Sequence, residues 1–361
     1  MDSKVEYIAE GTFGCVFTSK IACSDKILEI PNTNKYVSKV SVKSKDEMND
    51  KEILIGKKIS DNVKHYDYYF APILSSCPID VGVIEDEEIK KCNIINKEKG
   101  DATEYISSTL KYIGKNSLYD YLDIHYNNEN KHIKCILETH LHLLTSLQKF
   151  LKMEDAIVHY DLKDGNVMFD ELYNVPIIID YGLSYTKSEL FESPPSIEIL
   201  KKIFYVYYEK YSPWNIDVVL LSYITQSIAV KDKINIITQI MQPYLQNLKN
   251  VVEDFVRECE LFDTVEEKVL FIENTQNYLS QFMDKPLRVL IDDLCRKWKS
   301  WDNYSVAVMY YIYLLDNSHL YVDKHIVMYR NLLKEIIYSP PHDERLDPTE
   351  TYDSLLFLSI E

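Results

Sequence analysis

Glycine is scarce in this chain of 361 residues, which has only 8, and none follows Gly182. Tight β-hairpins favour glycine because their turns need positive backbone φ angles. The second half of the chain is therefore not expected to be built from hairpins. Its apolar residues recur at helical spacing instead, which predicts helices, for example over residues 244–259 and 306–315.

Positive charge is also in short supply, with 40 Lys and Arg against 57 Asp and Glu, a net charge of -17. A nucleic-acid binder needs a basic surface, so the negative net charge argues against this class. The longest apolar stretch, around residues 216–230, is interrupted by polar side chains and is too short to span a bilayer. The N-terminus has no apolar signal segment. We expect a soluble, cytoplasmic protein that binds no nucleic acid and no membrane.

The sequence has no C-x-x-C pair, which excludes the usual zinc-site spacing. An odd number of scattered cysteines fits a reducing compartment better than a disulfide framework. We therefore expect unpaired cysteines. The seven are Cys15, Cys23, Cys77, Cys92, Cys135, Cys259 and Cys295.

The first half of the chain has a different pattern from the second. Residues 6–18, 35–42 and 103–113 alternate and are rich in β-branched and aromatic side chains, which predicts strands. The stretch 85–100 is crowded with charge and is interpreted as a solvated loop or hairpin. These patterns predict a small β-rich part, followed from about residue 114 by a larger helical part.

The most distinctive stretch is HYDLKDGNVM at residues 159–168. An apolar strand is expected at residues 175–179, and it leads directly into Asp180-Tyr181-Gly182. Together these resemble the catalytic loop H-R-D-L-x-x-x-N and the D-F-G motif of protein kinases. A surface hairpin can carry any one of these residues by coincidence, but it does not explain their joint occurrence.

This resemblance implies a role for each polar residue. Asp161 would orient the substrate hydroxyl and accept its proton, and Lys163 would contact the γ-phosphate, as is typical of serine/threonine kinases. Asn166 and Asp180 would hold Mg²⁺ through oxygen ligands.

Residues 8–16, IAEGTFGCV, resemble the kinase Gly-rich loop G-x-G-x-x-G-x-V, with Ala9 in place of the first glycine. Gly11 and Gly14 would let backbone N–H groups close over the phosphates. Two glycines in a hairpin by themselves indicate only a turn. The residues that this match places on the nucleotide are Ile8, Ala9, Gly11, Thr12, Phe13, Gly14 and Val16.

Residues 36–40, YVSKV, look like the kinase strand V-A-I-K, in which the lysine bridges the α- and β-phosphates. Lys39 is that lysine. Glu52 is its predicted partner because it lies on the apolar face of the following helix. The alternative is that both residues are solvated charges. Gly56 departs from the family, which usually has a bulky apolar side chain there.

Residues 110–122 resemble the kinase hinge and the helix that follows it. By this match, Lys111 and Ile113 would offer backbone groups to adenine. A plain core strand would contain the same residue types. The predicted apolar walls of the pocket are Val16, Val37 and Met168.

Residues 212–222, SPWNIDVVLLS, resemble the start of the large buried kinase helix, D-x-W-S-x-G. Asp217 would brace the backbone of the catalytic loop, although an aspartate before an apolar run is often a helix cap. Arg345 is a candidate partner for the activation segment.

Three residue patterns depart from the family. Tyr160 replaces the catalytic-loop arginine, which grips an activation-loop phosphate in kinases switched by phosphorylation. Activity is therefore expected not to depend on such a phosphate on Ser184, Thr186 or Ser188. Tyr181 replaces the phenylalanine of D-F-G, and no A-P-E motif follows it before Asp217.

The resemblance implies an α+β fold with two lobes, within one kinase domain over residues 1–361. A small β-rich N-lobe with one helix would cover residues 1–113, and a mostly helical C-lobe would cover residues 114–361. The implied activity is transfer of the γ-phosphoryl group of ATP, with Mg²⁺, to a serine or threonine of a protein substrate. The residue composition is similar to that of kinases from large cytoplasmic DNA viruses, and such a viral protein would lie in the host cytoplasm or in the virion.

Three alternatives stay open at this point. The first is a pseudokinase that binds ATP and acts as a scaffold. The second is a small-molecule kinase on a related fold. The third is a helical interaction domain without enzymatic activity, which leaves the ordered set of motifs unexplained. The sequence does not predict the oligomeric state.

Overall fold

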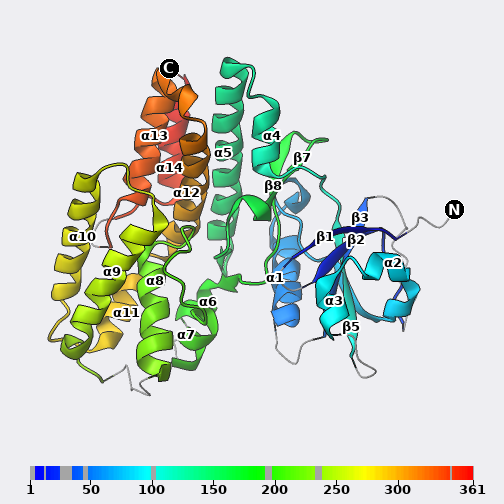
Figure 1. Cartoon of the computed structure of the whole chain (residues 1–361), viewed down its shortest axis with the longest axis horizontal. Coiled ribbons are helices and arrows are strands. Elements are labelled where there is room, and N and C mark those ends of the chain that lie inside the picture. Colours follow the sequence, from blue (N-terminus) through cyan, green and yellow to red (C-terminus); the bar gives the residue numbers. More distant parts are fainter. Residues whose placement is uncertain are drawn as a thin grey trace. The chain divides into compact units, whose positions relative to one another are not determined.

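The computed structural model describes residues 5–11, 14–24, 35–43, 48–98, 103–191, 197–231, 238–341 and 344–360. Over these residues the fold is mixed α and β, with a small antiparallel sheet of five strands near the N-terminal end and a larger helical part (Figure 1). The chain divides into two compact units. The first is Met1–Lys115 with Met168–Leu183, and the second is Asn116–Val167 with Ser184–Glu361.

The sheet of the first unit has the strand order β1-β2-β3-β5-β4, and neighbouring strands are antiparallel. Its strands are β1 (Tyr7–Glu10), β2 (Cys15–Thr18), β3 (Tyr36–Val42), β4 (Ser75–Ile79) and β5 (Tyr105–Lys111). All but β4 lie in the stretches predicted as strands, so those predictions are confirmed. β4 contains Pro78, which removes a ladder donor and obscures the pattern. The sheet tolerates this proline because β4 is an edge strand.

Two neighbouring residues of β3 show how the sheet is covered. Because side chains alternate along a strand, Lys39 and Val40 point to opposite faces. Val40 lies in a buried cluster with side chains of α2 (Asp86–Ile89) and α3 (Asn93–Glu98). Lys39 contacts α1 (Met48–Asn62). One face of the sheet is therefore covered by α1 and the other by α2 and α3 (Figure 1).

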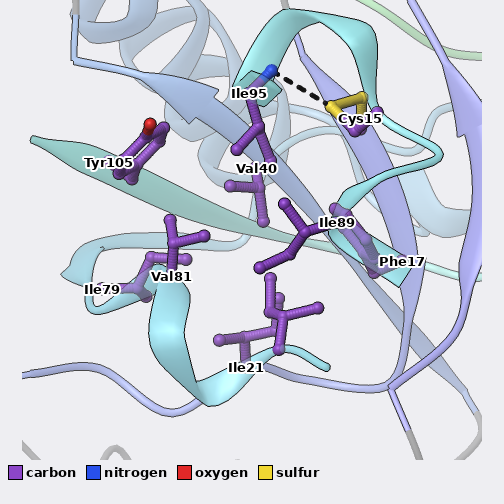
Figure 2. Close-up of a cluster of buried hydrophobic side chains, with 11 residues drawn as sticks. Cys15, Phe17, Ile21, Val40, Ile79, Val81, Ile89, Ile95 and Tyr105 are labelled. Atoms are coloured by element: carbon purple, nitrogen blue, oxygen red, sulfur yellow. Dashed lines mark hydrogen bonds between the residues drawn. A yellow bond between two sulfur atoms is a disulfide. The ribbon is translucent and has the colours of Figure 1, made fainter. Parts of the chain in front are cut away.

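The α2–α3 segment corrects the prediction of a solvated loop at residues 85–100. Ile89, Cys92 and Ile95 are 2%, 0% and 0% exposed and pack against Phe17 and Val40 of the sheet (Figure 2). The charged residues that dominate this stretch hid a buried apolar side. The segment is therefore part of the core of the first unit.

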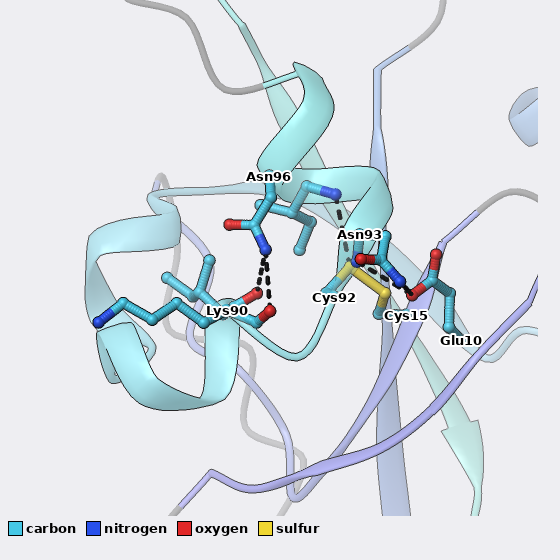
Figure 3. The surroundings of a disulfide bond; sticks show 8 residues. Glu10, Cys15, Lys90, Cys92, Asn93 and Asn96 are labelled. Carbon is cyan, nitrogen blue, oxygen red and sulfur yellow. Dashed lines mark hydrogen bonds between the residues drawn. A yellow bond between two sulfur atoms is a disulfide. The ribbon is translucent and has the colours of Figure 1, made fainter.

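Four of the seven cysteines form disulfides, which overturns the expectation that all are unpaired. Cys15 of β2 is bonded to Cys92 (Figure 3), and Cys23 is bonded to Cys77 of β4. The partners are 77 and 54 residues apart in sequence, so spacing alone does not reveal the pairs. The pairing removes the cysteine argument for a reducing compartment. The cysteines outside the disulfides are Cys135, Cys259 and Cys295, all of them buried.

Helix α1 directs one face into the first unit. Glu52, Ile55 and Ile59 on this face are 4%, 2% and 0% exposed. Gly56 beside them explains a departure noted in the sequence: a Cβ atom there would lie only 3.0 Å from the carbonyl oxygen of Ile73. Glycine is favoured at this position because the helix backbone passes close to another backbone segment.

The second unit is mostly helical. Its two short strands, β6 (Ile157–Val158) and β9 (Tyr185–Thr186), pair with each other. The hairpin of β7 (Val167–Asp170) and β8 (Val175–Ile178) follows the catalytic-loop motif, and all of it but Val167 belongs to the first unit. The α-helices of the second unit are α4 (Leu118–Ile124), α5 (Glu129–Lys152), α6 (Lys187–Phe191), α7 (Ile197–Ile203), α8 (Ile216–Tyr223), α9 (Leu245–Cys259), α10 (Val265–Ser280), α11 (Leu287–Cys295), α12 (Trp301–Asp316), α13 (Lys324–Ile337) and α14 (Pro348–Ile360).

Two of these helices were predicted from periodicity. The prediction at residues 244–259 matches α9, and the prediction at residues 306–315 falls inside α12. Helix α12 is buried over its first eleven residues, 301–311, including polar ones such as Asp302 and Asn303. A helix buried on all sides forms the centre of a unit rather than its surface. None of the helices within the described ranges combines the length and apolarity needed to cross a membrane.

Candidate active site

In the first unit, three predicted site residues meet around the ammonium group of Lys39. Its Nζ lies 3.2 Å from Glu52 Oε2 and 3.5 Å from Asp180 Oδ1. Burial lowers the pKa of Lys39, but the two carboxylates outweigh this and hold it above its usual value. Lys39 therefore carries a fixed positive charge, with 15% of its side chain exposed.

The Gly-rich stretch forms the turn between β1 and β2. The Gly11 N–H donates to the Gly14 carbonyl at 2.9 Å. A Cβ atom on Gly14 would lie 2.5 Å from the Val40 carbonyl oxygen, so the packing of β2 on β3 requires this glycine. A Cβ atom on Gly11 would meet nothing nearer than 3.8 Å. In the described part of the chain, packing therefore does not explain why residue 11 is a glycine. Close approach of a ligand to the backbone would explain it.

The same hairpin is held to the α2–α3 segment. Glu10 Oε2 accepts hydrogen bonds from the backbone N–H and the side-chain amide of Asn93 at 3.0 and 3.1 Å, beside the Cys15–Cys92 disulfide (Figure 3). Exposed Ile8 and Ala9 of β1 belong to this hairpin. The predicted ligand residues Thr12 and Phe13 lie outside the described residues.

The remaining predicted nucleotide residues also belong to the first unit. Val16 and Met168 are half-buried and Val37 is buried. Lys111 ends β5, where its Nζ pairs with Asp170 Oδ2 at 3.0 Å. Among the described residues, no backbone group bonds the N–H or C=O of Ile113, which follows the strand. This leaves the Ile113 backbone able to bond a ligand.

In the second unit, the catalytic-loop motif places two polar side chains beside the Asp161 carboxylate. Lys163 Nζ and the Asn166 side-chain amide each donate to Asp161 Oδ2 at 2.9 Å. The Asn166 amide also donates to the Asp161 carbonyl at 2.7 Å, which closes the loop on itself. The three predicted residues are thus held as one hydrogen-bonded group.

The carboxylate that braces this loop is Asp302 of α12, not Asp217 as predicted. Asp302 accepts the backbone N–H of His159 at 2.7 Å and that of Tyr160 at 2.9 Å. Asp302 is buried, and this burial raises its pKa while the two N–H donors oppose the shift. The sequence carries a signal that was missed: residues 302–307, DNYSVA, fit D-x-W-S-x-G, with tyrosine and alanine as substitutes.

Asp217 has a different partner. Its carboxylate pairs with Arg345 Nη1 at 2.8 Å, and both side chains are almost completely buried. Arg345 also donates to the Ser339 carbonyl at 3.0 Å. The pair fixes the start of α8 to the segment that precedes α14. Asp217 is therefore structural, and the suggested role of Arg345 as a partner of the activation segment stays a prediction.

The two tyrosines that depart from the kinase motifs are both buried. Tyr181 donates its hydroxyl to the Ile178 carbonyl at 2.7 Å, so this polar atom is satisfied. Tyr160 is 4% exposed, and its ring packs near the rings of Tyr185 and Trp214 at centroid distances of 5.4 and 5.1 Å. An apolar aromatic environment therefore surrounds the position that corresponds to arginine in the H-R-D pattern.

Sequence reasoning also missed Tyr211, because no motif signals it. Its hydroxyl donates to Asp161 Oδ1, the carboxylate oxygen that Lys163 and Asn166 do not contact. Its ring packs edge-to-face on Trp214 at 4.8 Å. Burial and the Asp161 carboxylate raise the pKa of Tyr211, so the phenol stays protonated and acts as the donor.

The residues predicted to hold Mg²⁺ fit that ion in their chemistry. Asn166 uses its amide nitrogen toward Asp161, which leaves the carbonyl oxygen as its ligand atom. Asp180 offers a carboxylate that is 37% exposed. No group of three or more His, Cys, Asp or Glu suited to a metal occurs among the described residues. Magnesium does not require one, since it is usually bound by one or two carboxylates together with substrate phosphates and water.

No protein-family model matches the chain, and no curated protein matches it either. Function must therefore be inferred from the residues and their contacts.

Proposed function

We propose that the chain is an ATP-dependent serine/threonine protein kinase with a bilobal kinase-like fold. The observation that carries the proposal is the group around Asp161. This carboxylate is held by Lys163 and Asn166, and the loop that carries it is braced at two backbone amides by Asp302. Such a held carboxylate next to an ammonium group suits proton acceptance from a hydroxyl and neutralisation of a phosphoryl group.

Each unit contributes its own set of groups. In the first unit, Lys39 keeps its positive charge between Glu52 and Asp180, as needed to bind the α- and β-phosphates of the substrate ATP. In the second unit, Asp161 would orient the acceptor hydroxyl and take its proton, while Lys163 would neutralise charge on the transferred group. Phosphoryl transfer consists mainly of such positioning and charge neutralisation.

Asn166 and Asp180 would hold Mg²⁺ through their side-chain oxygen atoms. The bound ion would supply neutralisation of the negative charge on the phosphate oxygens.

The pseudokinase alternative is less well supported, because the sequence keeps Lys39, Glu52, Asp161 and Asp180, and Lys39 pairs with both Glu52 and Asp180. A small-molecule kinase shares the same chemistry and differs in its acceptor. We keep both as outcomes of the test below. A cytoplasmic setting is part of the proposal, although the two disulfides stand against a strongly reducing environment.

The test is transfer of labelled phosphate from ATP with Mg²⁺ to a library of Ser, Thr and Tyr peptides. Wild type is compared with Asp161→Asn and with Glu154→Gln, which alters an exposed carboxylate just before the loop. We expect Asp161→Asn to lower transfer by about 10²–10⁴-fold and to leave ATP binding intact. Glu154→Gln should match the wild type.

Two results would overturn the proposal. Folded wild type that binds ATP and transfers nothing is a pseudokinase. Transfer to free amino alcohols or sugars, with none to peptides, indicates a small-molecule kinase.

A further inference from the structure

The hydroxyl group of Tyr211 lies where a kinase reaction needs the hydroxyl of its acceptor. The group that must accept the acceptor's proton is Asp161, and one of its two oxygens, Oδ2, already bonds Lys163 and Asn166. The other oxygen, Oδ1, accepts a hydrogen bond from Tyr211. Both residues belong to the second unit, so this contact lies within one compact body.

We propose that Tyr211 is a site of self-phosphorylation and that its hydroxyl occupies the acceptor position on Asp161 until it is modified. This inference rests on the proposed kinase activity. The substrate is ATP, and the acceptor is the phenol of the same chain.

The reaction balances without any further reactant. Tyr211 Oη forms a bond to the γ-phosphorus of ATP, and the bond from that phosphorus to the β–γ bridging oxygen breaks. ADP leaves with the electron pair of that bond. The phenol proton passes to Asp161 Oδ1 along the existing hydrogen bond. Lys163, which bonds the same carboxylate at 2.9 Å, supplies positive charge beside the transferred group.

Three other hydroxyl groups between the D-Y-G motif and Tyr211 bond other partners. Ser184 donates to the His159 carbonyl at 3.2 Å. Thr186 and Ser188 bond each other at 3.0 Å, and Ser188 bonds Asp155 at 3.0 Å. None of these hydroxyls contacts Asp161 in the described part of the chain. Tyr211 is therefore favoured over them as the acceptor.

The product explains how the site would then open. A phosphotyrosine carries a charge of about −1.5 to −2 and is repelled by a neighbouring carboxylate. The family arginine that would hold such a phosphate is absent, since Tyr160 stands in its place among aromatic rings. Phosphorylated Tyr211 would leave Asp161, and Oδ1 would become available to a protein substrate.

The experiment uses the full chain, first treated with phosphatase and then incubated with ATP and Mg²⁺ over a dilution series. Mass spectrometry with fragmentation reports phosphate on Tyr211, and transfer to the Ser/Thr peptide library is measured in the same samples. We expect Tyr211 to gain one phosphoryl group with a rate constant that does not change on dilution. The gain should be lost in Asp161→Asn and unchanged in Tyr208→Phe, a nearby exposed tyrosine.

The outcomes separate this inference from the kinase proposal. Peptide phosphorylation that needs Asp161 while Tyr211 stays unmodified overturns the inference and leaves the kinase proposal standing. A Tyr211 modification rate that rises in proportion to protein concentration also overturns it, because the acceptor then comes from another molecule. If neither Tyr211 nor any peptide gains phosphate, the kinase proposal fails and this inference fails with it. These readings come from the wild type, so they do not depend on the folding of a variant.

Discussion

Asp302 and His159 are 143 residues apart in sequence, yet the carboxylate of one accepts the backbone N–H of the other at 2.7 Å. The neighbouring N–H of Tyr160 shares this acceptor. The conformation of the proposed catalytic loop therefore depends on a residue that lies far from it along the chain.

Replacing Asp302 by alanine should damage both stability and activity. Two buried amides would lose their acceptor, and each costs about 1–3 kcal/mol when left unsatisfied. Urea unfolding and peptide phosphorylation measure the two effects. Asp316→Ala, at the exposed end of the same helix, is the matched control and should change neither. Wild-type stability in Asp302→Ala would show that the loop amides have another acceptor.

The buried Arg345–Asp217 pair should behave as a coupled unit. Arg345→Met leaves the Asp217 carboxylate buried without a counter-charge, which costs about 3–5 kcal/mol. The double change Asp217→Asn with Arg345→Met should cost less than the sum of the single changes. Breaking the exposed Lys134–Glu138 pair by Lys134→Ala should cost no more than about 0.5 kcal/mol. Additive single effects in urea unfolding would argue against the coupling.

The disulfides predict a count of free thiols. Seven cysteines less the four in disulfides leave three, so thiol titration of the denatured, unreduced chain should find three per molecule. Changing Cys15 and Cys92 to serine should destabilise the first unit by roughly 3–5 kcal/mol, because the bond closes a long loop. Finding seven thiols in protein purified without reductant would contradict the pairing.

His140 on α5 predicts a loss of stability in acid. Its ring stacks on Tyr310 at 4.5 Å and bonds the Tyr329 hydroxyl at 2.7 Å. Burial lowers its pKa to about 3 from an ordinary 6.5, so below pH 6.5 the unfolded chain binds a proton that the folded chain does not. The free energy of unfolding should therefore fall by about 1.4 kcal/mol per pH unit from about pH 6.5 toward pH 3.

Other groups titrate in the same pH range, so the contribution of His140 is measured as the difference between the wild type and a variant without this histidine. Between pH 7 and pH 5, the free energy of unfolding measured in urea should fall by roughly 2 kcal/mol more in the wild type than in His140→Gln. His319→Gln, which alters an exposed histidine, should keep the wild-type slope. Equal slopes in wild type and His140→Gln would contradict the assignment.

Local sequence patterns predicted the elements that depend on local rules. The alternation of β1, β2, β3 and β5 and the amphipathic face of α9 are properties of short stretches, and the structure confirms them. Lys39 and Glu52 could be predicted as a pair because they lie on two consecutive elements, the strand β3 and the helix α1. The ordered motifs gave the polar residues of the catalytic loop in the same way.

The other features depend on contacts between distant parts of the chain. Asp217 and Asp302 each lie in the first turn of an apolar helix, and only the fold decides which of them reaches the loop amides. The partner of Cys15 is set by where α3 packs, and Tyr211 reaches Asp161 from 50 residues away. The many charged residues at 85–100 led to the prediction of a solvated loop, although Ile89, Cys92 and Ile95 are buried. Average composition does not indicate which side chains point inward.

The position of Asp302 also matters during synthesis. The ribosome releases the loop motif well over a hundred residues before α12 exists, so the amides of His159 and Tyr160 must wait for their acceptor. A fragment that ends before residue 301 would contain the Gly-rich, lysine, catalytic-loop and D-Y-G motifs and still have an unanchored catalytic loop. Expression trials that cut the chain after the recognisable motifs should therefore yield inactive protein, and the smallest working fragment must extend through α12.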